Sequence, residues 1–344
     1  MKNILKVIFV IIGTLIGAGF ASGKEIYIFF NKYGICGIIG ILVSGLIIGI
    51  LVYKVFYILL KQREINEYNE LLNYMFDNRK KNRFNIVRII NYIINIFLII
   101  SFYIMSAGFS SYFKQEYNIS IYIASTIFAV LCYIILKNNI EGIIKISSIL
   151  VPIIIIFILN LGSQNFAFSI NQIANMNFLG NMFVDSIISS VLYASYNSII
   201  LIPVLISLKR YINNKNKICI GVFTSLIIII LSIFVYIILL KASVDIMKLD
   251  LPLIYVVKQF GKIYEYLYGI VIIISIFTSA LSAGYSFLKN CTKSKKNYNI
   301  ILIIMCVTSV FIANIGFSNL VNILYPIFGI LGIIQIYYIL KIKT

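Results

Sequence analysis

Long apolar runs recur along the whole chain, and they constrain the fold more than any other feature. A bilayer core needs about 20 apolar residues for each helical span, and ten such runs can be placed between residues 4 and 340. The mean hydropathy is +1.01, and only 12% of the 344 residues are charged. A soluble domain of this length would need a larger charged surface. We therefore expect one integral membrane domain covering residues 1–344, because no polar stretch is long enough for a second.

The expected architecture is all-α, with about ten transmembrane helices. Their ranges are 4–30, 34–60, 86–112, 119–136, 141–161, 179–207, 217–240, 262–288, 298–316 and 319–340. Two shorter helices are expected beside them. Apolar residues at helical spacing in 64–78, followed by a basic cluster at 79–83, predict an interfacial helix on the cytoplasmic leaflet. Leu251-Pro252 is a suitable start for a short outer helix over 251–260.

The charge pattern orients these helices. With the N-terminus inside, 22 of the 29 lysines and arginines fall in inner segments, as the positive-inside rule requires. Both termini are then cytoplasmic, in a multi-pass protein of the cell membrane surrounded by lipid. The net charge of +18 therefore reflects topology, and no nucleic-acid partner is expected. A cleaved signal peptide is the alternative for residues 2–23, but the apolar run resumes at Ile26, which favours an uncleaved first helix.

Several kinds of chemistry are disfavoured by composition. The chain has no histidine, and its five cysteines show no CxxC spacing, which argues against imidazole catalysis and the usual metal sites. It also lacks a GxxxxGK[ST] loop, a clustered acid pair and a recognisable nucleophile motif. We expect neither an enzyme nor an ATP-driven pump, and no bound cofactor apart from a coupling ion.

The ten expected helices divide into two halves of similar length, 4–161 and 179–341. An odd number of spans in each half makes the second half enter the membrane from the opposite side, which is the inverted repeat of many secondary transporters. The first and sixth helices would then be equivalent, and a binding site would lie where both are interrupted.

The first helix carries a clear interruption signal in residues 13–25. Four glycines fall within eleven residues, and Lys24-Glu25 follows them inside an apolar stretch. Each glycine weakens a helix by about 1 kcal/mol relative to alanine. Close packing through small residues is the alternative, although packing does not explain the charged pair. A broken helix offers N–H groups to a carboxylate and C=O groups to a cation, which predicts a midplane site for an anionic or zwitterionic solute.

The sixth helix carries a weaker signal of the same kind. Residues 193–198 read Tyr-Ala-Ser-Tyr-Asn-Ser, and Pro203 follows. Asn and Ser compete for backbone hydrogen bonds, and a proline frees the carbonyl four residues earlier. We therefore expect a second opening near residues 194–199, close to the first.

The run from Gly17 to Ile26, GAGFASGKEI, resembles the signature of the YkvI-type amino-acid permeases. These bacterial membrane proteins are related to the amino acid–polyamine–organocation superfamily. Residues 192–197, LYASYN, resemble the sixth-helix pattern of that family, and helix count and layout agree over essentially the whole chain. The resemblance implies a LeuT-like five-plus-five inverted-repeat fold, and it bears on the fold more than on the substrate.

The resemblance also implies a Na⁺ site. LeuT-like sodium-coupled carriers often place hydroxyls of the eighth helix against carbonyls of the first. Here the candidates would be Thr278, Ser279 and Ser282, with backbone oxygens of Gly17 and Phe20. Hydroxyl and carbonyl oxygens suit a hard cation, although such side chains commonly bond their own preceding turn. Proton coupling and uncoupled transport stay open as alternatives.

The remaining candidates are polar or aromatic residues inside the expected spans. Asp185 and Glu25 are intramembrane acids, which are functional candidates by default, and we assign them to coupling or gating. Asp185 could instead lie at the outer interface. The expected substrate-binding residues are Gly17, Ala18, Gly19, Ala21, Ser22, Gly23, Tyr103, Tyr193, Ser195, Tyr196 and Asn197.

The leading functional prediction is a secondary active transporter for an amino acid or a similar small zwitterion, driven by Na⁺ or H⁺. The alternative is a ligand-sensing membrane protein on the same fold, like the transporter-like subunits of spore germinant receptors. The sequence does not separate the two, and it leaves the substrate and the oligomeric state open.

Overall fold

The computed structural model describes residues 2–76, 81–137, 139–174, 180–241, 250–292 and 294–342. These residues are mostly α-helical, and no strand occurs among them. Arg79 and Lys80 of the expected basic cluster lie outside these ranges.

The helices follow the ranges expected from the apolar runs. The first expected span is divided into α1 (Lys2–Leu15), α2 (Ala18–Ala21) and α3 (Lys24–Phe29). The other long helices are α4 (Ile35–Lys61), α6 (Lys81–Tyr117), α7 (Ile121–Leu136), α8 (Asn139–Ala174), α9 (Gly180–Leu208), α10 (Lys217–Leu239), α12 (Lys262–Cys291), α13 (Lys295–Ile312) and α14 (Phe317–Lys341). Both short helices exist, as α5 (Tyr68–Phe76) and α11 (Pro252–Lys258).

Seven helices among the described residues are long and apolar enough to cross a membrane: α4, α6, α8, α9, α10, α12 and α13. The two parts of α14 meet at a bend of 40° and would together form an eighth span. Apolar segments of α1 and α7 are shorter. The all-helical, multi-pass membrane architecture is therefore confirmed, while the count of ten spans stays a prediction.

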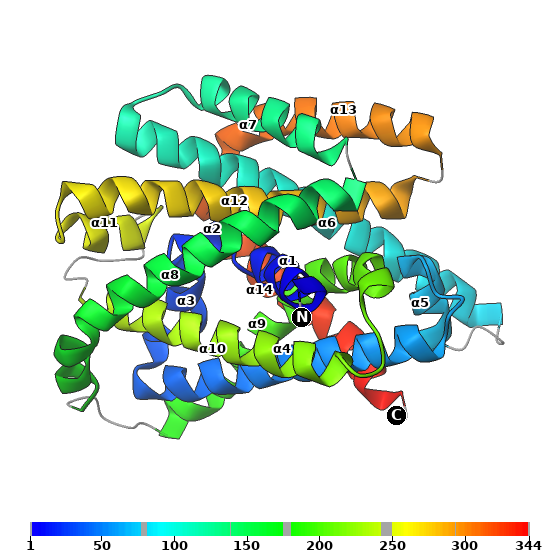
Figure 1. The fold of residues 1–344 in the computed structure, drawn as a ribbon, viewed down its shortest axis with the longest axis horizontal. Coiled ribbons are helices and arrows are strands. Elements are labelled where there is room, and N and C mark those ends of the chain that lie inside the picture. The colour runs from blue at the N-terminus through cyan, green and yellow to red at the C-terminus, as the bar shows by residue number, and fades with distance from the viewer. Residues whose placement is uncertain are drawn as a thin grey trace.

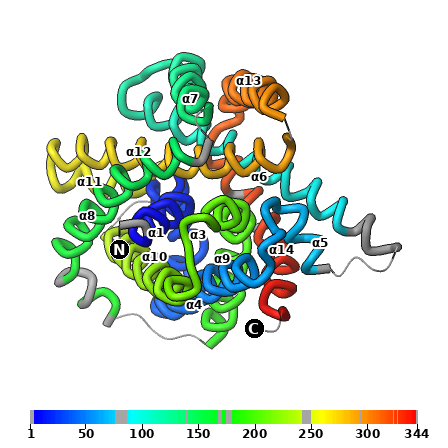
Figure 2. The backbone as a smooth tube through the Cα atoms, turned by 45° about the vertical axis from the view of Figure 1, so that its right-hand side comes forward, coloured from blue at the N-terminus to red at the C-terminus, as the bar shows by residue number. Residues whose placement is uncertain are grey.

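The long helices pack in layers around α1. Helices α7 and α13 contact each other on one side of α6 and α12, and α4, α9 and α10 lie on the opposite side (Figures 1 and 2). Helix α1 is seen nearly end-on near the centre of Figure 1 and contacts α8, α9, α10 and α12. The C-terminal end of α1 is therefore enclosed by protein, which is where irregular backbone is tolerated at membrane depth.

The predicted interruption of the first helix is confirmed. Helix α1 ends at Leu15, and Gly17 adopts an extended conformation with φ −92° and ψ −169°. After the single turn of α2, Gly23 adopts a left-handed conformation with φ +81°. That conformation suits glycine, and an added Cβ there would also lie 2.7 Å from the Leu253 side chain. Gly23 therefore redirects the chain into α3 beneath the start of α11.

The predicted break in the sixth helix is wrong. Helix α9 runs without interruption from Gly180 to Leu208, through residues 194–199. The polar side chains bond to carbonyls of their own helix instead of opening it. Asn197 donates to the Tyr193 carbonyl at 2.9 Å, and Ser198 donates to the Ser195 carbonyl at 2.6 Å. Pro203 removes only one backbone donor, and the tightly packed helix tolerates that loss. Of the two expected interruptions, only the one in the first helix is therefore present.

The predicted placement of the 64–78 segment also needs correction. The apolar stripe of Ile65, Tyr68, Leu72 and Met75 is buried against protein, because α5 contacts α6, α9 and α14. The Tyr68 hydroxyl accepts a hydrogen bond of 2.7 Å from Gln335 in α14. The stripe therefore packs against the helix bundle, whereas the sequence suggested that it packs against a lipid leaflet.

We expect Leu72→Ala to lower the free energy of unfolding by about 2–5 kcal/mol, because Leu72 is fully buried and its truncation leaves a cavity. Tyr74→Ala on the exposed face of α5 is the control, with an expected change within about 0.5 kcal/mol. Detergent-based unfolding of the purified variants measures both. Equal effects of the two substitutions would place the stripe outside the bundle.

Candidate functional site

The carbonyl end of α1 is open toward α12. The last four carbonyls of a helix lack intrahelical partners. The carbonyls of Ile12 and Leu15 accept hydrogen bonds from the amides of Ile16 and Gly17. The carbonyls of Gly13 and Thr14 instead accept the Ser279 hydroxyl, at 3.2 and 3.0 Å. The break thus places two main-chain oxygens against a side-chain oxygen of another helix.

Further hydroxyls extend this group of oxygens. Thr14 Oγ1 lies 2.8 Å from Ser282 Oγ and 2.8 Å from the Val10 carbonyl oxygen. Ser282 also donates to the Thr278 carbonyl. We define the oxygen cluster as the Gly13 and Thr14 carbonyls with the hydroxyls of Thr14, Ser279 and Ser282. Oxygens of this kind are ligands for a hard cation.

The oxygen cluster lies one turn before the carbonyls that the sequence suggested. The Gly17 carbonyl accepts the Ala21 amide, and the Phe20 carbonyl accepts the Gly23 amide. The Thr278 hydroxyl donates to Ser275 in its own helix. Of the expected ligands, Ser279 and Ser282 reach the break through their side chains. Within the described residues, no three His, Cys, Asp or Glu side chains group as metal ligands.

The end of the break that leads into α3 is closed by α11 and α12. The Leu253 amide donates to the Ser22 carbonyl at 2.9 Å, and the Tyr268 hydroxyl donates to the Ala21 carbonyl. The Ser22 hydroxyl turns back to the Gly19 carbonyl at 3.0 Å. Ala18, Ala21 and Ser22 are all buried. The break is therefore sealed from solvent on this side by main-chain and side-chain bonds.

Glu25 occupies the inside of this sealed region. Its side chain is 2% exposed, and its carboxylate accepts the Tyr196 hydroxyl. The Tyr325 hydroxyl and the Phe20 amide also bond to it. A Cβ at Gly19 would overlap the Glu25 side chain, so glycine there makes room for the acid. Glu25 thus joins the broken helix to α9 and α14.

Stacked aromatic rings hold Tyr196, which donates a hydrogen bond to Glu25, in place. The Tyr196 ring stacks on Phe29 at 5.6 Å and on Tyr325 at 4.8 Å between centroids. Tyr193 packs edge-on against Phe29, Phe30 and Tyr196. Such pairs add about 0.5–1.5 kcal/mol each beyond area burial. The hydroxyl of Tyr196 is therefore fixed toward Glu25.

The other expected site residues lie in different surroundings. Ser195 and Asn197 are buried in α9, where Asn197 bonds its own helix. The Tyr103 hydroxyl pairs with Thr308 of α13 at 2.7 Å. Asp185 is exposed near the start of α9. That position agrees with the interface alternative for this acid.

Four side chains at the break were not among the residues expected from sequence: Thr14, Met105, Tyr268 and Tyr325. The Met105 sulfur accepts the Ala18 amide at 3.3 Å, so a side chain of α6 satisfies the first amide of α2. Thr14 lies inside the glycine run and could have been considered there. Nothing in the local pattern around Tyr325 points to Glu25, which lies 300 residues away in sequence.

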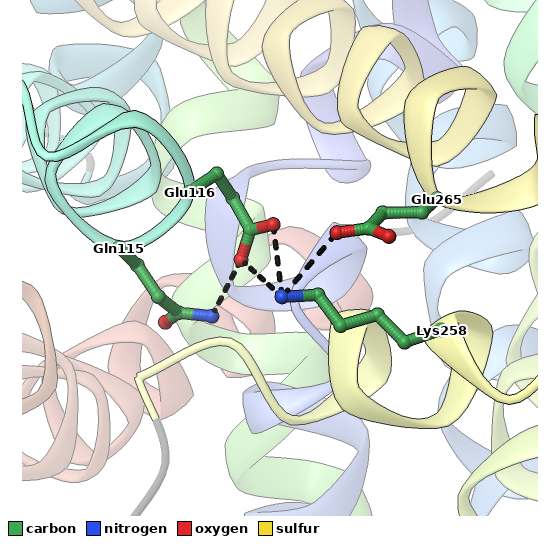
Figure 3. A network of polar contacts seen from close by, with 4 residues as sticks. All are labelled: Gln115, Glu116, Lys258 and Glu265. Atoms are coloured by element: carbon green, nitrogen blue, oxygen red, sulfur yellow. Dashed lines mark hydrogen bonds and ion pairs between the residues drawn. The ribbon is translucent and has the colours of Figure 1, made fainter. Parts of the chain in front are cut away.

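A charged network fastens α11 above the break (Figure 3). Lys258 of α11 lies 3.0 Å from Glu116 at the end of α6 and 3.4 Å from Glu265 in α12. Gln115 also donates to Glu116 at 3.0 Å. Partial burial lowers the pKa of Lys258, but the hydrogen bonds and charges of Glu116 and Glu265 outweigh burial, so its pKa is raised above the usual value. The ammonium therefore stays charged and links three helices.

No protein-family model matches the chain. Two proteins of Bacillus subtilis (strain 168) are similar over most of their length. The uncharacterized membrane protein YkvI is 29% identical over 329 residues, which cover 93% of this chain and 90% of YkvI. The uncharacterized protein YyaD is 22% identical over 337 residues, covering 96% of this chain and 94% of YyaD.

Among solved structures, a Na⁺-coupled sialic acid symporter in a substrate-bound, outward-open state is similar in fold. The TM-score is 0.56 at 14% identity, over 95% of this chain and 75% of that protein. The comparisons place the chain with membrane proteins and a symporter rather than with enzymes. The chain is therefore a multi-pass membrane protein that shares a fold with a Na⁺-coupled symporter.

Double-mutant cycles should resolve the two halves of the Lys258 network. For Lys258→Met with Glu116→Gln we expect a coupling of about 0.5–1 kcal/mol, after allowing for the 42% exposed Lys258 side chain. With Glu265→Gln we expect at most about 0.3 kcal/mol, because that pair is longer and Glu265 is more exposed. Unfolding free energies of the four proteins in each cycle provide the measurement. A coupling to Glu265 equal to that of Glu116 would contradict this ranking.

Proposed function

We propose that the chain is a secondary active transporter for an amino acid or a similar small zwitterionic solute, driven by Na⁺ or H⁺. The observation that carries the proposal is the interruption of the first helix inside the bundle, with the Gly13 and Thr14 carbonyls turned toward Ser279. Transporter folds use such discontinuous helices to bind solutes and coupling ions near the bilayer midplane. The similarity in fold to a Na⁺-coupled symporter supports the same function.

The packing supports a five-plus-five inverted repeat, with residues 4–161 and 179–341 as its halves. If α1 is equivalent to α9, then the contact of α1 with α8 corresponds to that of α9 with α14. The contact of α4 with α9 likewise corresponds to that of α10 with α1. The pairs α4–α10, α6–α12 and α7–α13 each join a helix to its own equivalent, as expected at a pseudo-two-fold axis. In this arrangement the chain crosses the cell membrane ten times, with both termini in the cytoplasm.

The oxygen cluster is the proposed position of a coupling Na⁺. Its five oxygens come from α1 and α12, so a bound cation would tie the broken helix to a neighbouring layer. Glu25 is the proposed gating residue, because it links α3 to α9 and α14 from a buried position. Alternating access requires such contacts to form and release as the layers move.

Flux into proteoliposomes tests the proposal directly. Purified protein is reconstituted, and uptake of a panel of radiolabelled amino acids is followed under a Na⁺ gradient, a proton gradient and neither. Gradient-driven uptake is the expected result. Ligand-induced thermal stabilisation with no uptake under any gradient would instead favour the ligand-sensing alternative.

We expect Ser279→Ala to raise the Na⁺ concentration for half-maximal thermal stabilisation by about ten-fold, because one ligand of the oxygen cluster is lost. Ser275→Ala is a matched control one turn earlier in α12, where the hydroxyl is equally buried but bonds only the Val271 carbonyl. K⁺ at equal ionic strength corrects for salt effects. If the Na⁺ response were unchanged in Ser279→Ala, the oxygen cluster would not be the Na⁺ site.

A further inference from the structure

The amides at the break are already engaged by protein groups. Ala18 donates to Met105, and Ala21 and Ser22 donate to the carbonyls of Gly17 and Ala18. Gly23 donates to the Phe20 carbonyl, and Phe20 donates to Glu25. Helix α2 has only four residues, so little helix dipole acts there. A solute carboxylate therefore finds few free donors at the break.

The protein's own carboxylate takes the place that the sequence assigned to the solute's carboxylate. Glu25 packs over Gly19, bonds the Phe20 amide and is held by the hydroxyls of Tyr196 and Tyr325. A second carboxylate brought beside it would meet like-charge repulsion in a site from which water is excluded. The chemistry of this position therefore disfavours an anionic group of the solute.

A cation has the opposite effect at this position. No ion pair to Glu25 forms among the described residues, where its bonds come from two hydroxyls and one amide. Lys24 precedes it in α3, and neighbouring helix residues do not face each other. A buried carboxylate is stabilised by a paired and hydrogen-bonded cation. A solute ammonium would supply that cation, and the rings of Phe29, Tyr193 and Tyr196 offer apolar surface beside it.

We propose that the site recognises a solute through its protonated amine, with Glu25 as the residue that binds it, and that a solute carboxylate is dispensable. The inference rests on the proposed function and defines the substrate class more closely as amines, of which amino acids are one kind. Tyr196 acts as a positioning residue, since its hydroxyl orients the Glu25 carboxylate.

Matched ligand sets test this assignment. Thermal shifts of the purified full chain are measured with each amino acid, its decarboxylated amine and its deaminated acid; leucine, 3-methylbutylamine and 4-methylpentanoate form one set. We expect the amine to bind wherever the amino acid binds, and the acid not to bind. Binding of the acid without the amine overturns the inference and leaves the transporter proposal standing. No shift with any compound of the panel counts against the proposed function and the inference together.

Variants of Glu25 separate recognition from folding. Glu25→Gln should weaken amine binding by about thirty-fold or more, because it removes one partner of a buried charge pair. Glu25→Asp keeps the charge and should recover part of that loss. Tyr196→Phe also keeps the charge but removes the hydroxyl that orients the carboxylate, so it should weaken amine binding by about five-fold, clearly less than Glu25→Gln. Equal losses in Tyr196→Phe and Glu25→Gln would assign Glu25 a structural role only. If Glu25→Gln fails to fold, Glu25→Asp replaces it, because the shorter side chain withdraws the carboxylate by one methylene group. Wild-type amine affinity in a folded Glu25→Asp would also overturn the assignment.

Discussion

The structure depends on one constraint, which is that backbone N–H and C=O groups buried in a membrane protein need partners. A continuous helix supplies these partners through its own hydrogen bonds. The first helix is interrupted over several residues, so partners there must come from elsewhere. The missing partners come from five residues of four other elements: Ser279 and Tyr268 of α12, Met105 of α6, Leu253 of α11, and Glu25 of α3. The interruption is thus stable only inside this bundle, and each partner ties another helix to it.

This arrangement explains why the buried acid lies where it does. Glu25 needs hydrogen-bond donors, and the break provides an amide while α9 and α14 provide tyrosine hydroxyls. The stacked rings of Phe29, Tyr196 and Tyr325 surround this polar contact with apolar surface. Such a surrounding strengthens each hydrogen bond and also makes its loss costly. Movement of α3 relative to α9 would therefore disturb the acid, its donors and the stack together.

Much of this could be predicted from local sequence, and the rest could not, for physical reasons. The helix ranges and the break at Gly17 and Gly23 follow from apolar runs and from glycine's backbone freedom, which act locally. The Asn197 and Ser198 signal failed because those side chains can either open a helix or bond its carbonyls, and packing decides which. The contact of Glu25 with Tyr325 depends on how distant helices pack, and no local pattern encodes it.

The bond from the Leu253 amide to the Ser22 carbonyl has a consequence for how the sequence of α11 can vary. Main-chain atoms make this link, so nearly any residue at 253 can form it, and proline alone among the standard residues removes the donor. Side chains of α11 can therefore change in related chains while its hold on the break is kept. The connection depends on backbone geometry, so sequence divergence along α11 would say little about whether the bond is kept.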